Sequence, residues 1–160
     1  MAGGPISPSS VYLGGASGNL FPNFYAGGGG NAAPHDEGIG VVASLAADAV
    51  AELRFPMPPS IPTGTLKLMV RVMANATTGN ILFTVSDGAC GTGTSPSATT
   101  LTGETQSTAT ISAVDKYLDT KVTLTTVPTA NQTLIVAITF NHTSWTLAQV
   151  LTCLVWVLWE

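Results

Sequence analysis

Side chains that could support catalysis or bind a metal are few in this chain, and they match no known site motif. His35 lies in the run 34–37, PHDE, inside a glycine-rich stretch where neighbouring side chains of an extended backbone point apart. His142 follows an asparagine in a predicted turn. The chain contains no HxH, HExxH, CxxC, GxSxG or GK[ST] spacing. We therefore expect no catalytic residues, no metal, no cofactor and no enzyme activity.

The remaining candidates are carboxylates and one tryptophan. Asp87, Asp115 and Asp119 are predicted in turns, where they form no EF-hand loop and Asp115 and Asp119 favour turn capping. Trp145, in the loop 141–146, is a candidate glycan contact of the kind that exposed aromatic residues provide in β-sandwich carbohydrate-binding modules. The alternative for Trp145 is packing at an edge of a sandwich.

The stretch 64–88 is the clearest indication of the elements that must position such residues. Apolar residues alternate with other residues from Leu66 to Met73 and again from Ile81 to Ser86, a period typical of strands with one buried face. The link 75–80 is rich in turn-forming residues. We interpret the stretch as a β-hairpin.

Further strands are predicted along the rest of the chain. The segment 47–55 alternates and stops at prolines, so we prefer a strand to the short helix that its Ala, Glu and Leu residues would also allow. Other strands are expected within 98–114, 120–126, 134–140 and 147–159. About seven to nine short strands without a confident helix predict an all-β, antiparallel two-sheet β-sandwich of jelly-roll type.

Residues 1–40 are predicted to form an extended Gly/Pro-rich arm, and residues 41–160 the sandwich domain. The arm contains eleven of the seventeen glycines, yet it also contains apolar and aromatic anchors. Such anchors favour ordering on a partner surface, and the alternative is an arm that folds back on its own domain. The predicted partner-binding residues are Val11, Tyr12, Leu13, Leu20, Phe21, Phe24 and Tyr25.

The last strand, 147–159, is apolar on both faces. A strand with only one buried face alternates, so either the arm or another subunit is expected to cover the second face. We predict Val155, Trp156 and Trp159 at a subunit interface. The alternative is a strand that is central in a thick sandwich.

The composition of the chain favours protein partners over nucleic acid or a membrane. Only 9% of the residues are charged and the net charge is −4, which suits permanent contact with other protein. The five basic residues do not cluster in the sequence, so we expect no nucleic acid partner. No apolar run approaches the roughly 20 residues that span a membrane, and the N-terminus does not have the pattern of a signal peptide. Cys90 and Cys153 are either free thiols, which suits a protein made in a cytoplasm, or one bridge.

The run from Gly64 to Val85, which begins GTLKL and ends ANATTGNILFTV, resembles a pattern in small structural proteins of tailed bacteriophages. In that pattern a strand is followed by A-T-[ST]-G-N-[VI] and a second strand, and the resemblance continues loosely over residues 45–159. It implies a single jelly-roll domain in the virion, either as a capsid decoration (cement) protein or as a fibre component. The long arm and the very apolar last strand depart from the pattern and favour assembly onto a shell.

We therefore expect a capsid decoration protein that is made in the host cytoplasm and stabilises the phage head at the virion surface. Its partners would be the major capsid protein and further copies of itself, as a homo-oligomer that we expect to be a trimer. The alternative is a head- or tail-fibre module that binds a host-surface glycan or receptor, in which Trp145 would contact the sugar. A small major capsid protein fits less well, because so little basic charge is available to face packaged nucleic acid.

Overall fold

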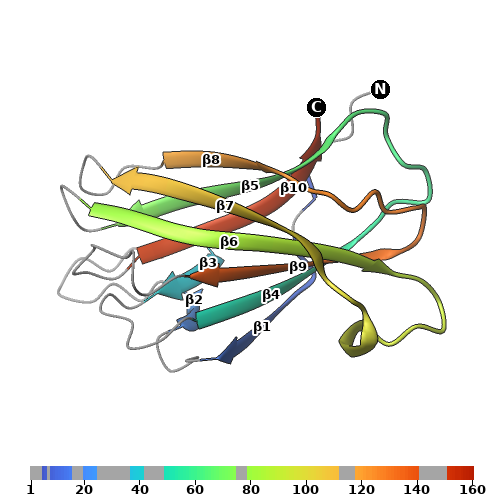
Figure 1. The fold of residues 1–160 in the computed structure, drawn as a ribbon, viewed down its shortest axis with the longest axis horizontal. Helices are drawn as coiled ribbons and strands as arrows, with labels where there is room; N and C mark the ends of the chain where they lie inside the picture. Colours follow the sequence, from blue (N-terminus) through green and yellow to red (C-terminus); the bar gives the residue numbers. More distant parts are fainter. Residues whose placement is uncertain are drawn as a thin grey trace.

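The computed structural model describes residues 5–6, 8–15, 20–24, 37–41, 49–74, 79–111, 118–140 and 151–160. Within these residues, ten strands form two antiparallel sheets that stack face to face (Figure 1). The β9 sheet has the order β1-β4-β9-β6-β7, which are Ser10–Gly15, Ala49–Pro56, Thr133–Phe140, Gly79–Cys90 and Thr102–Ile111. The β10 sheet has the order β2-β3-β10-β5-β8, which are Leu20–Phe24, Glu37–Val41, Leu151–Trp159, Leu66–Ala74 and Leu118–Thr123. The predicted all-β sandwich is confirmed.

The core lies between the two sheets and is built from the inward half of each alternating strand. Leu68 in β5 and Phe83 in β6 are both 0% exposed and face each other's sheet within one apolar cluster. This burial removes apolar side chains from water at about 25 cal/mol per Å², which is the main stabilising contribution to such a fold. The other members that are at most 1% exposed are Ala51, Leu53, Phe55, Val70, Val85, Leu134, Val136, Ile138 and Val157.

The predicted hairpin within 64–88 is wrong, although both of its strands exist. β5 pairs with β10 and β8, whereas β6 pairs with β9 and β7, so the chain crosses from one sheet to the other between them (Figure 1). Alternation requires only that Leu68 and Phe83 reach the same core. Two strands that lie opposite each other across the core satisfy this requirement as well as two paired strands do.

The other strand predictions differ in their outcome. For the segment 47–55 we predicted a strand rather than a helix, and this strand is confirmed as β4. Its alternate residues Ala51, Leu53 and Phe55 point into the core. β8 begins at Leu118, two residues before the predicted start at Thr120. In the described residues the helical structure consists of the 3-10 helix η2, Pro96–Ala98. No helix of these residues is long and apolar enough to cross a membrane.

Parts of the N-terminal segment 1–40 belong to the two sheets. β1 pairs with β4, β2 pairs with β3, and β3 pairs with β10 at one edge of the sandwich. Ile6 adds an isolated bridge to Val157. The backbone of these segments therefore folds back on the chain's own domain, which was the alternative to an arm that extends onto a partner. The tetraglycine 27–30 lies outside the described residues.

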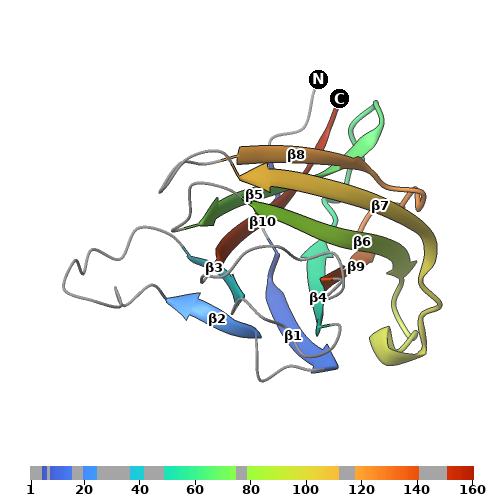
Figure 2. The same cartoon turned by 60° about the vertical axis from the view of Figure 1, so that its left-hand side comes forward.

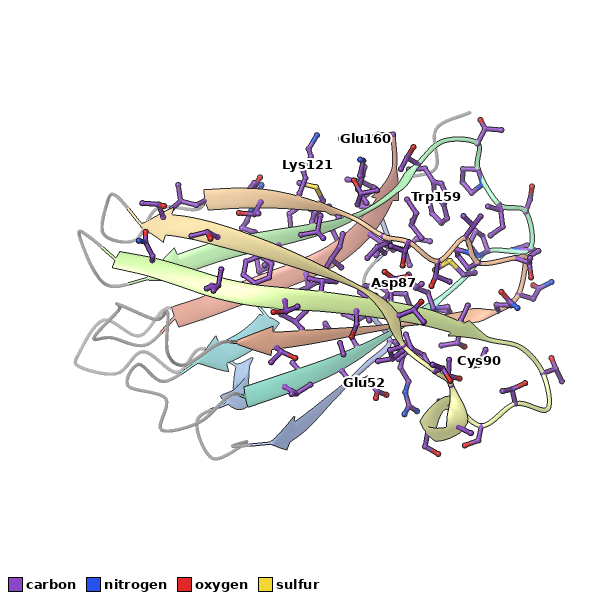
Figure 3. All side chains as sticks on the ribbon, in the orientation of Figure 1. Glu52, Asp87, Cys90, Lys121, Trp159 and Glu160 are labelled. Carbon is purple, nitrogen blue, oxygen red and sulfur yellow. The ribbon has the colours of Figure 1, made fainter. Side chains whose placement is uncertain are left out.

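The edge strands of the two sheets at the opposite side, β7 and β8, lie side by side in both views (Figures 1 and 2). Asp87, in β6, is 1% exposed and points between the sheets towards the segment that follows β8 (Figure 3). Its carboxylate accepts hydrogen bonds from the backbone N–H groups of Thr125 at 3.0 Å and Thr126 at 2.5 Å. The Thr125 hydroxyl donates to the same carboxylate at 3.1 Å. This contact fastens the β10 sheet to the β9 sheet at the edge.

A β-bulge in β7 accompanies this connection. The β6–β7 register changes between Val85 and Asp87, where β7 has one extra residue. Gly103 occupies the bulge at φ 72°, and a Cβ on it would lie 2.2 Å from the Thr125 hydroxyl oxygen. Only glycine permits both the backbone conformation and this approach of Thr125. Asp87 was predicted in a turn, which is wrong: it is a buried strand residue whose charge is satisfied by the loop opposite.

Candidate functional site

β10 presents different side chains to its two faces. Val155, Val157 and Trp159 point inward and are at most 8% exposed within the apolar core. Leu154, Trp156 and Leu158 point outward and are half-buried. Of the three residues predicted at a subunit interface, the structure therefore places Val155 and Trp159 in the core of the chain itself and only Trp156 on the outer face of the β10 sheet.

Trp156 stands in a patch that we call the Trp156 face, formed by the outward side chains of β8, β5 and β10. Cross-strand register aligns them in three rows: Lys121–Met69–Trp156, Asp119–Arg71–Leu154 and Thr123–Lys67–Leu158. Met69 is only 5% exposed although it points away from the core. Met69 is therefore a buried apolar side chain within this face.

Arg71 is fixed in the middle of this face by contacts on two sides. Its Nε and Nη2 donate hydrogen bonds to the two carboxylate oxygens of Asp119, at 2.6 and 2.8 Å. Its guanidinium carbon lies 5.1 Å from the centroid of the Trp156 ring, within the range of a cation–π contact. The hydrogen bond from Arg71 lowers the pKa of Asp119 below its ordinary value of 3.8, so this carboxylate is ionised at neutral pH.

The two lysines of the Trp156 face have different partners. Lys121 Nζ donates to the carboxylate of Glu160 and forms an ion pair with it (Figure 3). Lys67 Nζ donates to the neutral Thr123 hydroxyl at 2.6 Å. In the side chains that the structure describes, Arg71 and Lys121 are thus paired with carboxylates and Lys67 is not.

The outer face of the β9 sheet is built differently. There Glu52 and Arg54 form an ion pair at 2.9 Å, both within β4. The segment 99–101 lies against Gly88, where an added Cβ would be 2.7 Å from the Thr100 carbonyl oxygen. Cys90, a free thiol that is 6% exposed, follows on the same strand, so the alternative of a bridge between Cys90 and Cys153 is wrong. Part of this face is therefore covered by the chain's own loop.

The Trp156 face combines a half-buried indole ring with a guanidinium and a carboxylate that are held in fixed positions. Within the described residues, no group of three or more His, Cys, Asp or Glu side chains could hold a metal ion. The fixed groups of this face can donate and accept hydrogen bonds beside an apolar side chain.

The other residues predicted from the sequence are not brought to this face. Trp145, Tyr25, His35 and His142 lie outside the described residues. The backbones of β1 and β2 carry the remaining predicted arm residues, and their partner binding stays a prediction; these residues are Val11, Tyr12, Leu13, Leu20, Phe21 and Phe24.

Sequence reasoning missed the Arg71–Asp119 pair. Alternation in 66–73 already put Lys67 and Arg71 on one outward face, which was the available signal. Asp119 was predicted in a turn, which is wrong, because it lies in β8 opposite Arg71. The two residues are 48 positions apart, and their approach depends on the register between β5 and β8.

Comparison with known proteins identifies the fold and no family. Neither a protein-family model nor a curated protein matches the chain. Among solved structures, the family 11 carbohydrate-binding module from Clostridium thermocellum, in complex with a β-1,3-1,4-mixed-linked tetrasaccharide, aligns with a TM-score of 0.51 and 8% identity over 98% of this chain and 96% of that one. TmCBM61 in complex with β-1,4-galactotriose aligns with a TM-score of 0.50 and 9% identity over 96% of this chain and 91% of that one. At such identities the likeness establishes a shared β-sandwich fold.

Proposed function

We propose that this chain is a non-catalytic glycan-binding module and that the Trp156 face binds the saccharide. The proposal develops the alternative that the sequence offered, a head- or tail-fibre module that binds a host-surface glycan or receptor, with Trp156 in place of Trp145 as the proposed sugar contact. The observation that carries it is the stacked arrangement of Trp156 and Arg71, with Arg71 held by both oxygens of Asp119.

The chemistry of sugars explains why this arrangement suits them. A pyranose ring offers an apolar face of C–H bonds and a rim of hydroxyl groups that both donate and accept hydrogen bonds. Arg71 covers one side of the Trp156 ring, and the rest of the indole supplies a rigid apolar surface with a small entropic cost of ordering. Arg71 and Asp119 supply charged donors and acceptors, which form stronger hydrogen bonds than neutral groups. Because the pair is already fixed, little ordering remains when a ligand arrives.

The fold supports the proposal without carrying it. Two carbohydrate-binding modules share the sandwich over nearly their whole length and were solved with bound oligosaccharides. Because a shared fold hosts many functions, the residues of the Trp156 face carry the proposal.

The test is the binding of soluble polysaccharides, first by affinity electrophoresis and then by calorimetry with the oligosaccharide of the best ligand. Trp156→Ala should weaken binding by about ten- to thirtyfold, as expected for an aromatic residue at the centre of a site. Trp156→Phe should keep part of the affinity. Glu52→Gln, which removes an ion pair from the outer face of the other sheet, is the matched control and should bind like the wild type.

Two results would overturn the proposal. One is a wild-type protein that no polysaccharide of a broad panel retards. The other is a Trp156→Ala protein that binds as tightly as the wild type. Melting temperatures of Trp156→Phe and Glu52→Gln should agree with the wild type within about 2 °C, and Trp156→Ala, which also loses the contact with Arg71, should still unfold cooperatively.

Capsid decoration is the second candidate, and one observation favours it. Leu154, Trp156 and Leu158 form an outward apolar strip in a chain of which only 9% is charged, and such a strip also suits contact with a protein. In that case the strip would be covered by the major capsid protein or by another copy in a trimer at the virion surface. Light scattering separates the candidates: a stable oligomer that Trp156→Ala dissociates would favour decoration over glycan binding.

A further inference from the structure

We infer that the Trp156 face selects an acidic saccharide, one that carries a carboxylate or a sulfate, and that Lys67 binds the anionic group. This inference rests on the proposed function, because it names the class of glycan for the same face. The juxtaposition that carries it is a half-buried tryptophan beside a lysine that no carboxylate of the described residues neutralises.

The distribution of charge over the chain makes Lys67 unusual. The chain contains five basic residues against nine acidic ones. Three of the five basic residues, Lys67, Arg71 and Lys121, gather on the Trp156 face although they do not cluster in the sequence. Arg71 and Lys121 are engaged there by Asp119 and Glu160. Among the described side chains of this face, Lys67 is therefore the cation left to receive an anion from a ligand.

The position of Lys67 suits a sugar that stacks on Trp156. Lys67 and Met69 both point outward from β5, about 7 Å apart along the strand, and Met69 is paired with Trp156. Lys67 is paired with Leu158 in the next row. A sugar ring against the part of Trp156 that Arg71 leaves uncovered thus places its substituents within the reach of a flexible lysine side chain. The Thr123 hydroxyl accepts one hydrogen bond from Nζ, and an ammonium group has two further donors to offer.

The anion is expected to be a single group rather than a polyanion. A net charge of −4 repels a dense run of phosphates, and Lys67 alone would neutralise little of it. One carboxylate or sulfate at Lys67 is less affected, because at physiological ionic strength charges beyond about 8 Å are largely screened. The selectivity should therefore be modest and should shrink at high salt.

The test uses pairs of ligands that share a sugar backbone and differ in the presence of one kind of anionic group. One pair is an oligogalacturonate and its methyl ester, and the other is a sulfated galactan oligosaccharide and its desulfated form; the two pairs distinguish carboxylate from sulfate. The wild type should bind at least one acidic ligand about three- to fivefold more tightly than its neutral counterpart at about 0.1 M salt, as expected for a partly exposed ion pair. This preference should largely disappear at about 0.5 M salt.

Lys67→Met keeps the apolar stem and removes the charge. It should lower the affinity for the acidic ligand to that for the neutral one and leave neutral binding unchanged. Lys121→Met is the matched control on the same face, because its cation is already paired with Glu160, and it should keep the preference. A melting temperature within about 2 °C of the wild type establishes that Lys67→Met is folded.

The outcomes separate this inference from the proposed function. Neutral oligosaccharides that bind in a Trp156-dependent way, with no preference for the acidic forms, would overturn the inference and leave the proposed function standing. A Lys67→Met protein that keeps the preference would do the same. A wild type that binds no saccharide of either kind would overturn both.

Discussion

Replacing Asp87 should destabilise the sandwich more than its single carboxylate suggests. In the native structure this carboxylate accepts hydrogen bonds from the backbone N–H groups of Thr125 and Thr126 and from the Thr125 hydroxyl. Asp87 belongs to the β9 sheet, and its partners follow β8 of the β10 sheet. Asp87→Ala removes the acceptor of two backbone groups and a polar contact that joins the sheets across this edge.

The size of the effect follows from how well water can replace the lost partner. Each buried donor left without an acceptor costs about 1–3 kcal/mol. Asp87 is 1% exposed, but the Thr125 side chain is exposed and Thr126 is half-buried, so water reaches part of the site. We therefore expect Asp87→Ala to lower the free energy of unfolding by about 3 kcal/mol. In a domain of this size that corresponds to a loss of about 6–12 °C in melting temperature.

Asp87→Asn refines the prediction. The amide keeps one oxygen acceptor and replaces the other with an NH₂ group that faces donors, so a loss of about 1–2 kcal/mol is expected. Urea denaturation followed by tryptophan fluorescence measures all variants. Asp119→Asn is the control, since its ion pair is more than one third exposed and should contribute at most about 1 kcal/mol. An Asp87→Ala protein no less stable than Asp119→Asn would refute the role assigned to this carboxylate.

Two further predictions concern the same edge and the Trp156 face. Gly103→Ala should lower the free energy of unfolding by about 2–4 kcal/mol in urea, because Gly103 has φ 72° and a Cβ there would lie 2.2 Å from the Thr125 hydroxyl oxygen. Gly93→Ala, at φ 85° with no atom within 4 Å, is the matched control and should lose only about 1 kcal/mol; equal losses would contradict a role for Thr125. Asp119, whose pKa is lowered by Arg71, should stabilise the fold at neutral pH and lose that contribution as the pH falls below its ordinary value of 3.8 and through its lowered pKa. Carboxyl NMR titration should return the pKa of Asp119 towards that ordinary value in Arg71→Gln, and an unchanged pKa would refute the pairing.

The strands of the central stretch were predictable, and their partners were not. The alternation from Leu66 to Met73 identifies the residues that face the core, because burial of one face imposes a period of two. It does not identify the neighbouring strand, since Leu68 is flanked in the sheet by Val122 and Val157, both far away in the chain. The wrong hairpin arises from this gap: a short link rich in turn residues suits a crossing between sheets as well as a turn within one.

The candidate site was only half visible in the sequence for the same reason. Lys67 and Arg71 could be assigned to one outward face, and Trp156 was recognised as an anchor. Their approach depends on β5 lying between β8 and β10 in a particular register, which couples residues about 50 to 90 positions apart in the chain. Asp87 was predicted in a turn because it is polar. The sequence gives no sign of its hydrogen-bond partners Thr125 and Thr126, which lie 38 and 39 positions away.

The structure also changes what the very apolar last strand implies. Its two apolar faces suggested that either the N-terminal arm or another subunit covers the second one. In the structure the guanidinium of Arg71 lies over the Trp156 ring. Met69, the neighbour of Trp156 on β5, is buried, with only 5% of its surface exposed. The long side chain of Arg71 thus covers part of the apolar surface while its charged end remains partly exposed. A covering subunit is then no longer required to explain the apolar strand, and what remains half-exposed is a patch centred on one aromatic ring with fixed charges around it. Under the proposed function this patch binds a glycan, and under the second candidate a capsid protein or another copy covers it.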